Sequence, residues 1–519
     1  MNERSWWGWG FEGAAVAGAE LDELTARLPR HWVSEPLPVP AVGELRLRAP
    51  RVKPPAALVE VCTTDATVRA GHSLGKAYRD VMRALRGQLS PPDLVAFPAS
   101  ESDVVDLLDW AAGAGVAVVP YGGGSSVVGG VEYRGDLPHL SLDLTRLDRV
   151  LEVDDVSRAV RVQAGALGPV LERQLAEHGY TLRHFPQSFE FSTVGGWLAT
   201  RAGGHFATRL THIDDYVEAL RVVSPSGTTQ TRRLPASGAG PSPDRLFLGS
   251  EGTLGVITEA WLRVLDRPVY KASDSISFGS LAAALNSVRA ISQSGLDPSN
   301  CRLLDAAEAA VNMGRTDGAC VLLLGFESAD HPVHGPLARA VEIASDCGGV
   351  STRASTEDST DGASAWRTAF LRMPYRRDAL ARSGVVVETF ESACTWDKAA
   401  DLIESVRTHV SAAVAEICGE PGIVTCRLTH VYPDGVAPYF TVIARAKSGS
   451  EVRMWDEIKA AASGLLVRSG ATITHHHAVG RDHLRWYSAQ RPDLFDKVLR
   501  AAKDSLDPSG ILNPGVLFD

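Results

Sequence analysis

The sequence lacks the features that mark several specialised classes of protein. It has only seven cysteines among 519 residues and no CxxC pair, which disfavours a disulfide framework or a structural zinc site and predicts a reducing compartment. No run of about 18 apolar residues occurs, so no transmembrane helix is expected. Neither a secretory signal at the N-terminus nor a peroxisomal or lipidation signal at the C-terminus is recognisable. We therefore expect a cytoplasmic protein whose contact with membranes, if it has any, is peripheral.

Basic residues are also fewer than acidic ones. Lys and Arg number 52 against 62 Asp and Glu, which gives a formal net charge of −10. A nucleic-acid partner is disfavoured, because phosphate backbones are bound by concentrated basic surfaces. A local basic pocket for one small anion remains compatible with this balance. The hydrophobic fraction of 45 % and the charged fraction of 22 % are those of a folded globular protein.

The apolar pattern predicts an α+β chain. A short strand at 94–97, a helix that starts at Ser100–Asp103 and a strand at 116–119 form a βαβ unit. After residue 271 strands and helices alternate to about 471, which indicates a second α+β domain. We predict a helical arm and the start of the first domain over 1–90, a first domain over 91–267, a cap domain over 268–470, and a returning C-terminal segment over 471–519. Two polar segments, 235–243 and 351–363, are predicted to be mobile loops.

Three glycine-rich segments carry the strongest chemical signal. PYGGGSSVVGG at 120–130 directly follows a predicted strand, and its glycines allow several N–H groups to converge on one anion. It matches neither the P-loop nor the GxGxxG pattern. Segments 185–204 and 249–258 have the same Gly, Ser and Thr character. Each alone also fits a tight structural turn, but together they favour one extended, dinucleotide-like cofactor held by backbone groups.

A run of three histidines, His475 to His477, lies in ATITHHHAVG. In a strand, His475 and His477 would point one way and His476 the other. Imidazoles suit acid/base chemistry near neutral pH. Metal binding and a structural role are the alternatives, although three adjacent histidines in a core are costly to satisfy.

These segments together resemble the flavoproteins that have a vanillyl-alcohol oxidase type of FAD domain. The segment Trp6–Gly10, the stretch FEFSTVGGWLATRA, the stretch GSEGTLGVITEA and the histidine run narrow the resemblance to the alkyldihydroxyacetonephosphate synthase family, from about Trp6 to Asn513. The resemblance implies a two-domain α+β flavoprotein, with a PCMH-type FAD-binding domain and a cap of antiparallel sheet plus helices. It also implies non-covalent FAD, because the first glycine loop lacks the histidine that carries the flavin in some relatives.

The implied reaction replaces the acyl chain of acyl-dihydroxyacetone phosphate with a fatty alcohol, which makes an ether lipid through a flavin N5 adduct without net redox. The implied partners are this lipid substrate, the alcohol and a second copy of the chain in a homodimer. The main alternative is an FAD-linked oxidase or dehydrogenase of a hydroxy acid or an alcohol, which would use the same loops. A flavin-binding protein without catalysis is a further alternative.

The resemblance also implies roles for individual residues. Arg377, which lies 11 residues before Glu388, and Arg302 match the family's phosphate-binding arginines, and Arg suits bidentate phosphate recognition. Tyr439 matches a catalytic tyrosine, and the predicted catalytic set is Tyr439, His475, His476 and His477. The predicted FAD-binding residues are Pro120, Tyr121, Gly122, Gly123, Gly124, Ser125, Ser126, Gln187, Ser188, Phe189, Glu190, Phe191, Ser192, Thr193, Thr200, Arg201, Ala202, Gly203, Glu251, Gly252, Thr253, Leu254, Gly255, Val256 and Ile257. No resident metal is expected.

Overall fold

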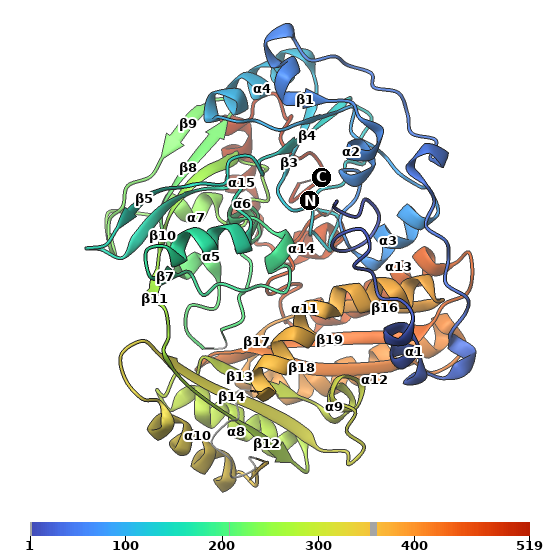
Figure 1. Cartoon of the computed structure of the whole chain (residues 1–519), viewed down its shortest axis with the longest axis vertical. Helices are drawn as coiled ribbons and strands as arrows, with labels where there is room; N and C mark the ends of the chain where they lie inside the picture. The colour runs from blue at the N-terminus through green and yellow to red at the C-terminus, as the bar shows by residue number, and fades with distance from the viewer. Residues whose placement is uncertain (1–2, 207, 353–360, 519) are drawn as a thin grey trace.

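The computed structural model describes residues 3–206, 208–352 and 361–518 (Figure 1). Two smaller sheets and their helices occupy one end of the molecule, and one large sheet with its helices occupies the other. All strands of the smaller sheets lie between Cys62 and Arg263, and the large sheet begins at Tyr270. The domain boundaries near 90, 267 and 470 remain predictions.

The first sheet holds the βαβ unit. Its strand order is β1-β2-β4-β3, with β2, β4 and β3 parallel, and the bounds are β1 (Cys62–Thr63), β2 (Leu94–Ala96), β3 (Ala117–Tyr121) and β4 (His139–Asp143). Helix α4 (Glu101–Ala114) joins β2 to β3. The Ser100 hydroxyl accepts from the Asp103 N–H at 3.2 Å and Asp103 accepts from the Ser100 N–H at 2.9 Å, which satisfies the first orphan amides of α4. The predicted helix start is confirmed.

The second sheet is antiparallel and has the order β5-β6-β10-β8-β9. Its strands are β5 (Val150–Asp154), β6 (Ala159–Gln163), β8 (Val217–Ser224), β9 (Gly227–Gln230) and β10 (Val256–Arg263). A two-stranded ribbon of β7 (Tyr180–Thr181) and β11 (Leu265–Asp266) adjoins it. Helices α5 (Gly168–Ala176), α6 (Val194–Thr200), α7 (Asp244–Phe247) and α15 (Asp493–Leu506) belong to this half, and α5, α6 and the sheet share one apolar core. Strands β8 and β9 form a hairpin around residues 225–227.

The large sheet is antiparallel, with the order β15-β12-β14-β13-β18-β19-β16 and β17 paired to β19. Its strands are β12 (Tyr270–Phe278), β13 (Asn300–Leu304), β14 (Cys320–Ser328), β15 (Val350–Ser351), β16 (Val385–Glu391), β17 (Cys394–Thr395), β18 (Ile423–Val431) and β19 (Gly435–Arg445). The main apolar core lies between this sheet and four helices, α8 (Leu281–Gln293), α10 (His334–Asp346), α12 (Trp396–Cys418) and α13 (Glu451–Arg468).

The other helices are α1 (Ala19–Ala26), α2 (Ala66–Gly71), α3 (Tyr78–Leu85), α9 (Ala306–Met313), α11 (Asp361–Arg382) and α14 (Leu484–Gln490). The predicted loop at 235–243 contains no helix or strand, as expected. The predicted loop at 351–363 is wrong at both ends, because Ser351 ends β15 and because α11, a helix that packs along β16 and α3, begins at Asp361. Residues 353–360 of that segment lie outside the described part of the chain.

Both ends of the described chain pack beside the loop that follows β3 (Figure 1). At the N-terminal end, the Arg4 guanidinium donates to the carbonyl of Gly123 at 3.3 Å and lies 4.1 Å from the centre of the Phe191 ring. At the C-terminal end, the Asn513 amide donates to the carbonyls of Gly130 at 3.2 Å and Glu251 at 2.8 Å. The two ends therefore belong to the walls of the same region.

Candidate active site

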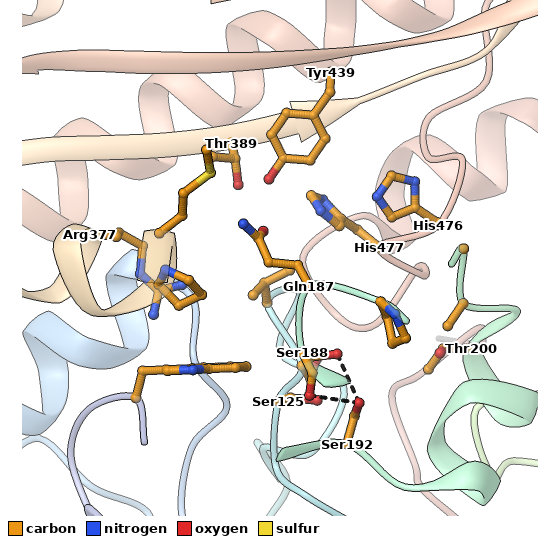
Figure 2. A pocket seen from close by; sticks show the side chains of 18 of the residues that line it. Ser125, Gln187, Ser188, Ser192, Thr200, Arg377, Thr389, Tyr439, His476 and His477 are labelled. Carbon is orange, nitrogen blue, oxygen red and sulfur yellow. Dashed lines mark hydrogen bonds between the residues drawn. The ribbon is translucent and has the colours of Figure 1, made fainter. Parts of the chain in front are cut away.

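A cavity of about 660 Å³ lies between the two halves of the molecule. The loop after β3, helix α6 and the loop before β10 line it from one half, and β18, β19, α9 and α11 line it from the other. Figure 2 shows Ser125, Ser192 and Thr200 on one side of this cavity and Tyr439 reaching toward them from β19. His476 and His477 close a third side, and Arg377 lies opposite them.

The glycine segments form one wall because they pack against each other without side chains. A methyl group on Gly123 would overlap the carbonyl oxygen of Phe191, and a Cβ on Gly252 would lie 2.7 Å from the Pro120 ring. A Cβ on Gly203 would lie 3.0 Å from His430 and 3.2 Å from His476. The glycines of segments 120–126, 185–204 and 249–257 therefore allow close packing of the loops that line the cavity, which leaves backbone polar groups available to a ligand.

Substitution of Gly123 by Ala is expected to abolish stable flavin binding, because the added methyl group has no room beside Phe191 and must displace the loop. The flavin-to-protein absorbance ratio after gel filtration measures the effect. Gly113→Ala in α4 is the matched control, since its Cβ would meet no atom within 4 Å. Full flavin content in Gly123→Ala would contradict the proposed wall.

Arg302 on β13 is a buried cation on the cap side of the cavity. Its side chain is only 1 % exposed, and its guanidinium lies 5.0 Å from the centre of the Phe370 ring. Burial, together with the charge of Arg427, lowers the pKa of Arg302 to about 9, while Glu308 opposes the shift. Arg302 is still cationic at neutral pH, and an anion in the cavity would stabilise its charge.

Arg377 on α11 is held by the next residue. Its Nε and Nη2 atoms donate to the same carboxylate oxygen of Asp378 at 2.9 and 2.7 Å. The other oxygen of Asp378 accepts from the backbone N–H of Trp9 at 2.6 Å. The N-terminal arm thus fixes Asp378, and Asp378 fixes the arginine that faces the cavity.

Asp378→Asn is expected to raise the KM for a phosphorylated substrate about 10-fold with a smaller change in kcat, because it weakens the fixation of Arg377 without removing the cation. Steady-state kinetics with varied substrate measure the split between the two constants. Asp330→Asn, which changes an exposed carboxylate, is the control. A loss confined to kcat would show that Asp378 does not act through binding.

Tyr439 is packed face-on against a buried ion pair. The Arg427 guanidinium lies 3.9 Å from the centre of the Tyr439 ring and donates to Glu308 at 2.9 Å. Burial raises the pKa of the Tyr439 hydroxyl, and Arg427 only partly opposes the shift. The hydroxyl points into the cavity beside Thr389 (Figure 2). It is therefore protonated at neutral pH and able to donate.

The histidine run is a loop and not a strand. One carboxylate, Glu391 at the end of β16, accepts from the backbone N–H of His475 at 2.5 Å, of His476 at 3.1 Å and of His477 at 2.9 Å. It also accepts from the Thr474 hydroxyl at 2.6 Å. Burial alone would raise the pKa of Glu391, but the neighbouring histidines and these hydrogen bonds lower it to about 2. Glu391 is therefore the charged anchor of the loop.

The loop presents its three side chains differently. His476 and His477 line the cavity, whereas His475 lies behind them against His212 and Tyr432. Burial lowers the pKa of His477 to about 4 and that of His476 well below its ordinary value. Both rings are neutral at pH 7 and can accept a proton from a group in the cavity.

Comparison with known proteins agrees with this geometry. Residues 92–232 match the family model of the FAD binding domain, and residues 267–517 match that of the C-terminal domain of FAD linked oxidases. A solved structure of an alkyldihydroxyacetonephosphate synthase superposes with a TM-score of 0.83 at 25 % identity, over 98 % of both chains. The synthases of Dictyostelium discoideum and Caenorhabditis elegans are each 30 % identical to the chain over 88 % of its length, which spans 78 % and 81 % of those relatives.

The chain belongs to the alkyldihydroxyacetonephosphate synthase family. Family membership confirms the predicted resemblance, the two-domain flavoprotein architecture and FAD as the cofactor of an FAD-dependent enzyme. The residues present fit this cofactor, since Gly123 and Gly252 line the cavity and let its loops pack at distances that a Cβ at either position would not allow. Hydroxyls of Ser125, Thr193 and Thr200 border the same cradle.

The structure brings most of the predicted site residues of this family member to the cavity. The ones that line it are Pro120, Tyr121, Gly122, Gly123, Gly124, Ser125, Ser126, Gln187, Ser188, Ser192, Thr193, Thr200, Ala202, Gly203, Glu251, Gly252, Gly255, Val256, Ile257, Arg302, Arg377, Tyr439, His476 and His477.

Seven predicted site residues lie elsewhere. Phe189, Phe191, Thr253 and Leu254 are buried, Glu190 and Arg201 are exposed, and His475 lies behind the cavity wall. Arg201 donates to Asp214 at 2.8 Å, and Thr253 donates to the Ser250 carbonyl at 2.7 Å. These side chains therefore support the glycine wall and do not form its surface.

Sequence reasoning missed several residues of the site. Glu391 and the pair Arg427–Glu308 hold the loop and the tyrosine, and His212 and His430 contact the histidine run. Each comes from a segment distant in sequence, with no local motif around it. Glu251 was predicted, but its carboxylate accepts from the N–H groups of Val479 and Gly480, both at 2.9 Å, and so ties the histidine loop to the glycine wall.

Acid is expected to destabilise this protein below about pH 6.5. Burial lowers the pKa of His139 and His477 to about 4 and of His184 and His430 to about 3, from an ordinary value of 6.5. The unfolded chain therefore binds more protons than the folded one in this window. The contribution of these histidines to stability is complete above pH 6.5 and falls as pH drops toward 4, by up to about 1.4 kcal/mol per pH unit per histidine. Asp80 and Glu251, whose pKa burial raises to about 7, oppose part of this slope.

Thermal unfolding between pH 7.5 and 5 measures this slope. His184→Phe should flatten this slope, because it removes one of the titrating rings. The substitution breaks no hydrogen bond, since neither ring nitrogen of His184 has a partner among the described residues. His409→Phe, on the surface, should leave the slope unchanged. An unfolding temperature that stays constant over this range would contradict the expectation.

Among the described helices, none has the length and apolar character needed to span a bilayer.

Proposed function

We propose that the protein exchanges the acyl chain of an acyl-dihydroxyacetone phosphate for a fatty alcohol, which yields an ether lipid without net oxidation. The observation that carries this proposal is that a single cavity combines the FAD cradle, two arginines, a tyrosine, neutral histidines and apolar walls. An enzyme that transfers hydride from a small hydroxy acid has no need of a long apolar wall.

The arginines bind the phosphate. The chain has a net charge of −10, yet Arg302 and Arg377 both line the cavity. Their planar guanidinium groups match phosphate oxygens in bidentate geometry. A phosphate dianion also compensates the cost of burying Arg302, which makes binding of the headgroup favourable at this end of the site.

Apolar side chains accommodate the hydrocarbon chains. Leu24 and Leu28 in and after α1, Val311 of α9, and Ile423 and Ile443 of the cap sheet line the same cavity. Burial of hydrocarbon against them contributes about 0.8 kcal/mol for each methylene. A long-chain substrate should therefore bind more tightly than a short-chain one.

The chemistry then divides between an acid and a base. The bond between the dihydroxyacetone carbon and the acyl oxygen breaks, and the alcohol oxygen forms the new bond to that carbon. Tyr439 donates its proton to the leaving carboxylate, and His476 or His477 takes the proton of the alcohol. Bound FAD supplies an electrophilic ring against which the dihydroxyacetone unit is held. The released fatty acid returns its proton to Tyr439 and leaves as the carboxylate, and the histidine gives up the proton of the alcohol, which restores the starting state.

The proposal also covers the setting of the enzyme. It includes a cytoplasmic homodimer that takes its lipid by peripheral membrane contact, with no nucleic-acid partner and FAD bound without a covalent bond. Analytical ultracentrifugation and flotation with phospholipid vesicles test the dimer and the membrane contact.

The decisive experiment mixes the FAD-loaded protein with palmitoyl-dihydroxyacetone phosphate, with and without hexadecanol. Mass spectrometry follows palmitate and the hexadecyl ether, while absorbance follows the flavin. Formation of both products with no oxygen or dye reduction supports the proposal. If this lipid leaves the flavin spectrum unchanged while a hydroxy acid reduces the flavin, the proposal is wrong and the oxidase or dehydrogenase alternative holds.

A further inference from the structure

Histidines from three distant segments meet at the cavity wall and directly behind it. His212 precedes a short 3-10 helix at Ile213–Asp215, His430 lies on β18, and His475 and His476 belong to the loop held by Glu391. The Nε2 atoms of His212 and His475 are 3.1 Å apart, and the Nδ1 atoms of His475 and His476 are 3.0 Å apart. Three imidazoles are thus joined in a row that starts at the cavity.

The partners at the outer end of the row assign the protons along it. His212 Nδ1 lies 2.9 Å from the carbonyl oxygen of Arg201, which can only accept, so this nitrogen carries the hydrogen. His212 Nε2 is then an acceptor, and we assign a hydrogen to His475 Nε2, which lies 3.1 Å from His212 Nε2 and 2.7 Å from the oxygen of the Tyr432 hydroxyl. His475 Nδ1 in turn accepts from His476 Nδ1. The remaining nitrogen of His476, its Nε2, is an acceptor on a ring that lines the cavity.

We propose that His476, His475 and His212 form a proton relay between the reaction cavity and the outer side of the histidine cluster. His476 Nε2 accepts the alcohol proton and releases its Nδ1 proton to His475 Nδ1. His475 releases its Nε2 proton to His212 Nε2, so the positive charge moves from the cavity to His212 and no other bond changes. The origin of the proton rests on the proposed function, but the arrangement of the relay does not.

The surroundings favour a charge on His212 over one on the inner rings. Burial and the charge of Arg201 lower the pKa of His212, but Asp214 and Asp215 oppose this shift. Burial and the neighbouring imidazoles lower the pKa of His475 and His476 well below its ordinary value, although Glu391 opposes the shift at His475. Tyr432 adds a side branch, because its hydroxyl lies 2.7 Å from His475 Nε2 and 3.1 Å from Thr211 Oγ1. His212 is a positioning and relay residue and does not touch the substrate.

A metal ion is the rival occupant of this cluster. One ring nitrogen from each of His430, His475 and His476 lies within 4.8 Å of the others. The relay accounts for the contacts of His475 and His476 without an ion, and His430 is fixed separately, 2.8 Å from the Gly204 carbonyl. The two interpretations make opposite predictions for the ring nitrogens.

The first test replaces His212 with Ala in the FAD-loaded enzyme. Ether formation should slow by about 10- to 100-fold, show a larger solvent isotope effect in D₂O than the wild type, and recover in part when imidazole is added. His409→Ala, on the surface of α12, is the matched control and should behave as the wild type. An unchanged rate and isotope effect in His212→Ala would overturn the relay.

The second test does not depend on turnover. Nitrogen-15 NMR of the histidine rings in the full-length FAD-loaded protein should find the hydrogen on Nε2 of His475 and on Nδ1 of His476 and His212. His475 protonated on Nδ1 would overturn the relay, as would one equivalent of tightly bound metal that His430→Ala loses. If the wild type makes no ether, the proposed function fails, while the ring tautomers still decide the relay.

Discussion

Tyr439→Phe is expected to lower kcat for ether formation by about 10²- to 10⁴-fold, the usual contribution of a positioned acid or base. The substitution removes only the hydroxyl that points into the cavity and leaves the ring packed against Arg427. Binding of the substrate should change little, because the phosphate is held by other residues. Single-turnover measurements of palmitate release isolate the affected step.

The flavin content of Tyr439→Phe serves as its internal control and should match that of the wild type, since Tyr439 lies on the cap side of the cavity. Tyr270→Phe, a change at an exposed tyrosine of β12, should be silent. A kcat within threefold of the wild type would exclude Tyr439 as the acid and leave only the histidines and Arg427 to assist the leaving carboxylate.

Glu391→Gln is expected to disable both the histidine loop and the fold around it. The carboxylate accepts three backbone N–H groups and the Thr474 hydroxyl, and an amide offers one oxygen acceptor and a misplaced NH₂ donor. Loss of the charge-assisted bonds should cost about 3 kcal/mol or more of unfolding free energy. Ether formation should fall more than 100-fold, because His476 and His477 lose their positions.

Chemical denaturation and the turnover rate measure the two effects of Glu391→Gln. Thr474→Val is the graded comparison, since it removes one of the four donors, and its effect on both quantities should be smaller. A variant with wild-type stability but no activity would mean that Glu391 acts on the chemistry directly and does not serve as an anchor.

The sequence was informative where function depends on neighbours along the chain. The three glycine segments were recognisable because each packs several small residues into one stretch, and the start of α4 was recognisable because its cap is local. Arg302, Arg377 and Tyr439 followed from the family resemblance. These three residues line the cavity.

The histidine run shows why the rest could not be predicted. In a strand, successive N–H groups point in opposite directions. Three consecutive N–H groups bonded to one carboxylate require a curled backbone, and that carboxylate is 84 to 86 positions away in sequence. The partners of His212 and His430 are still more distant, at 263 and 226 positions in the sequence. Contacts of this kind are set by the packing of the two halves.

The packing of both chain ends against the loop after β3 has a consequence for biosynthesis. Arg4 contacts Gly123 from one end, and Asn513 contacts Gly130 and Glu251 from the other. The walls of the FAD cradle are therefore incomplete while the last residues are still inside the ribosome. We therefore expect flavin to bind only after Asn513 and its neighbours have been synthesised and have packed against the loop.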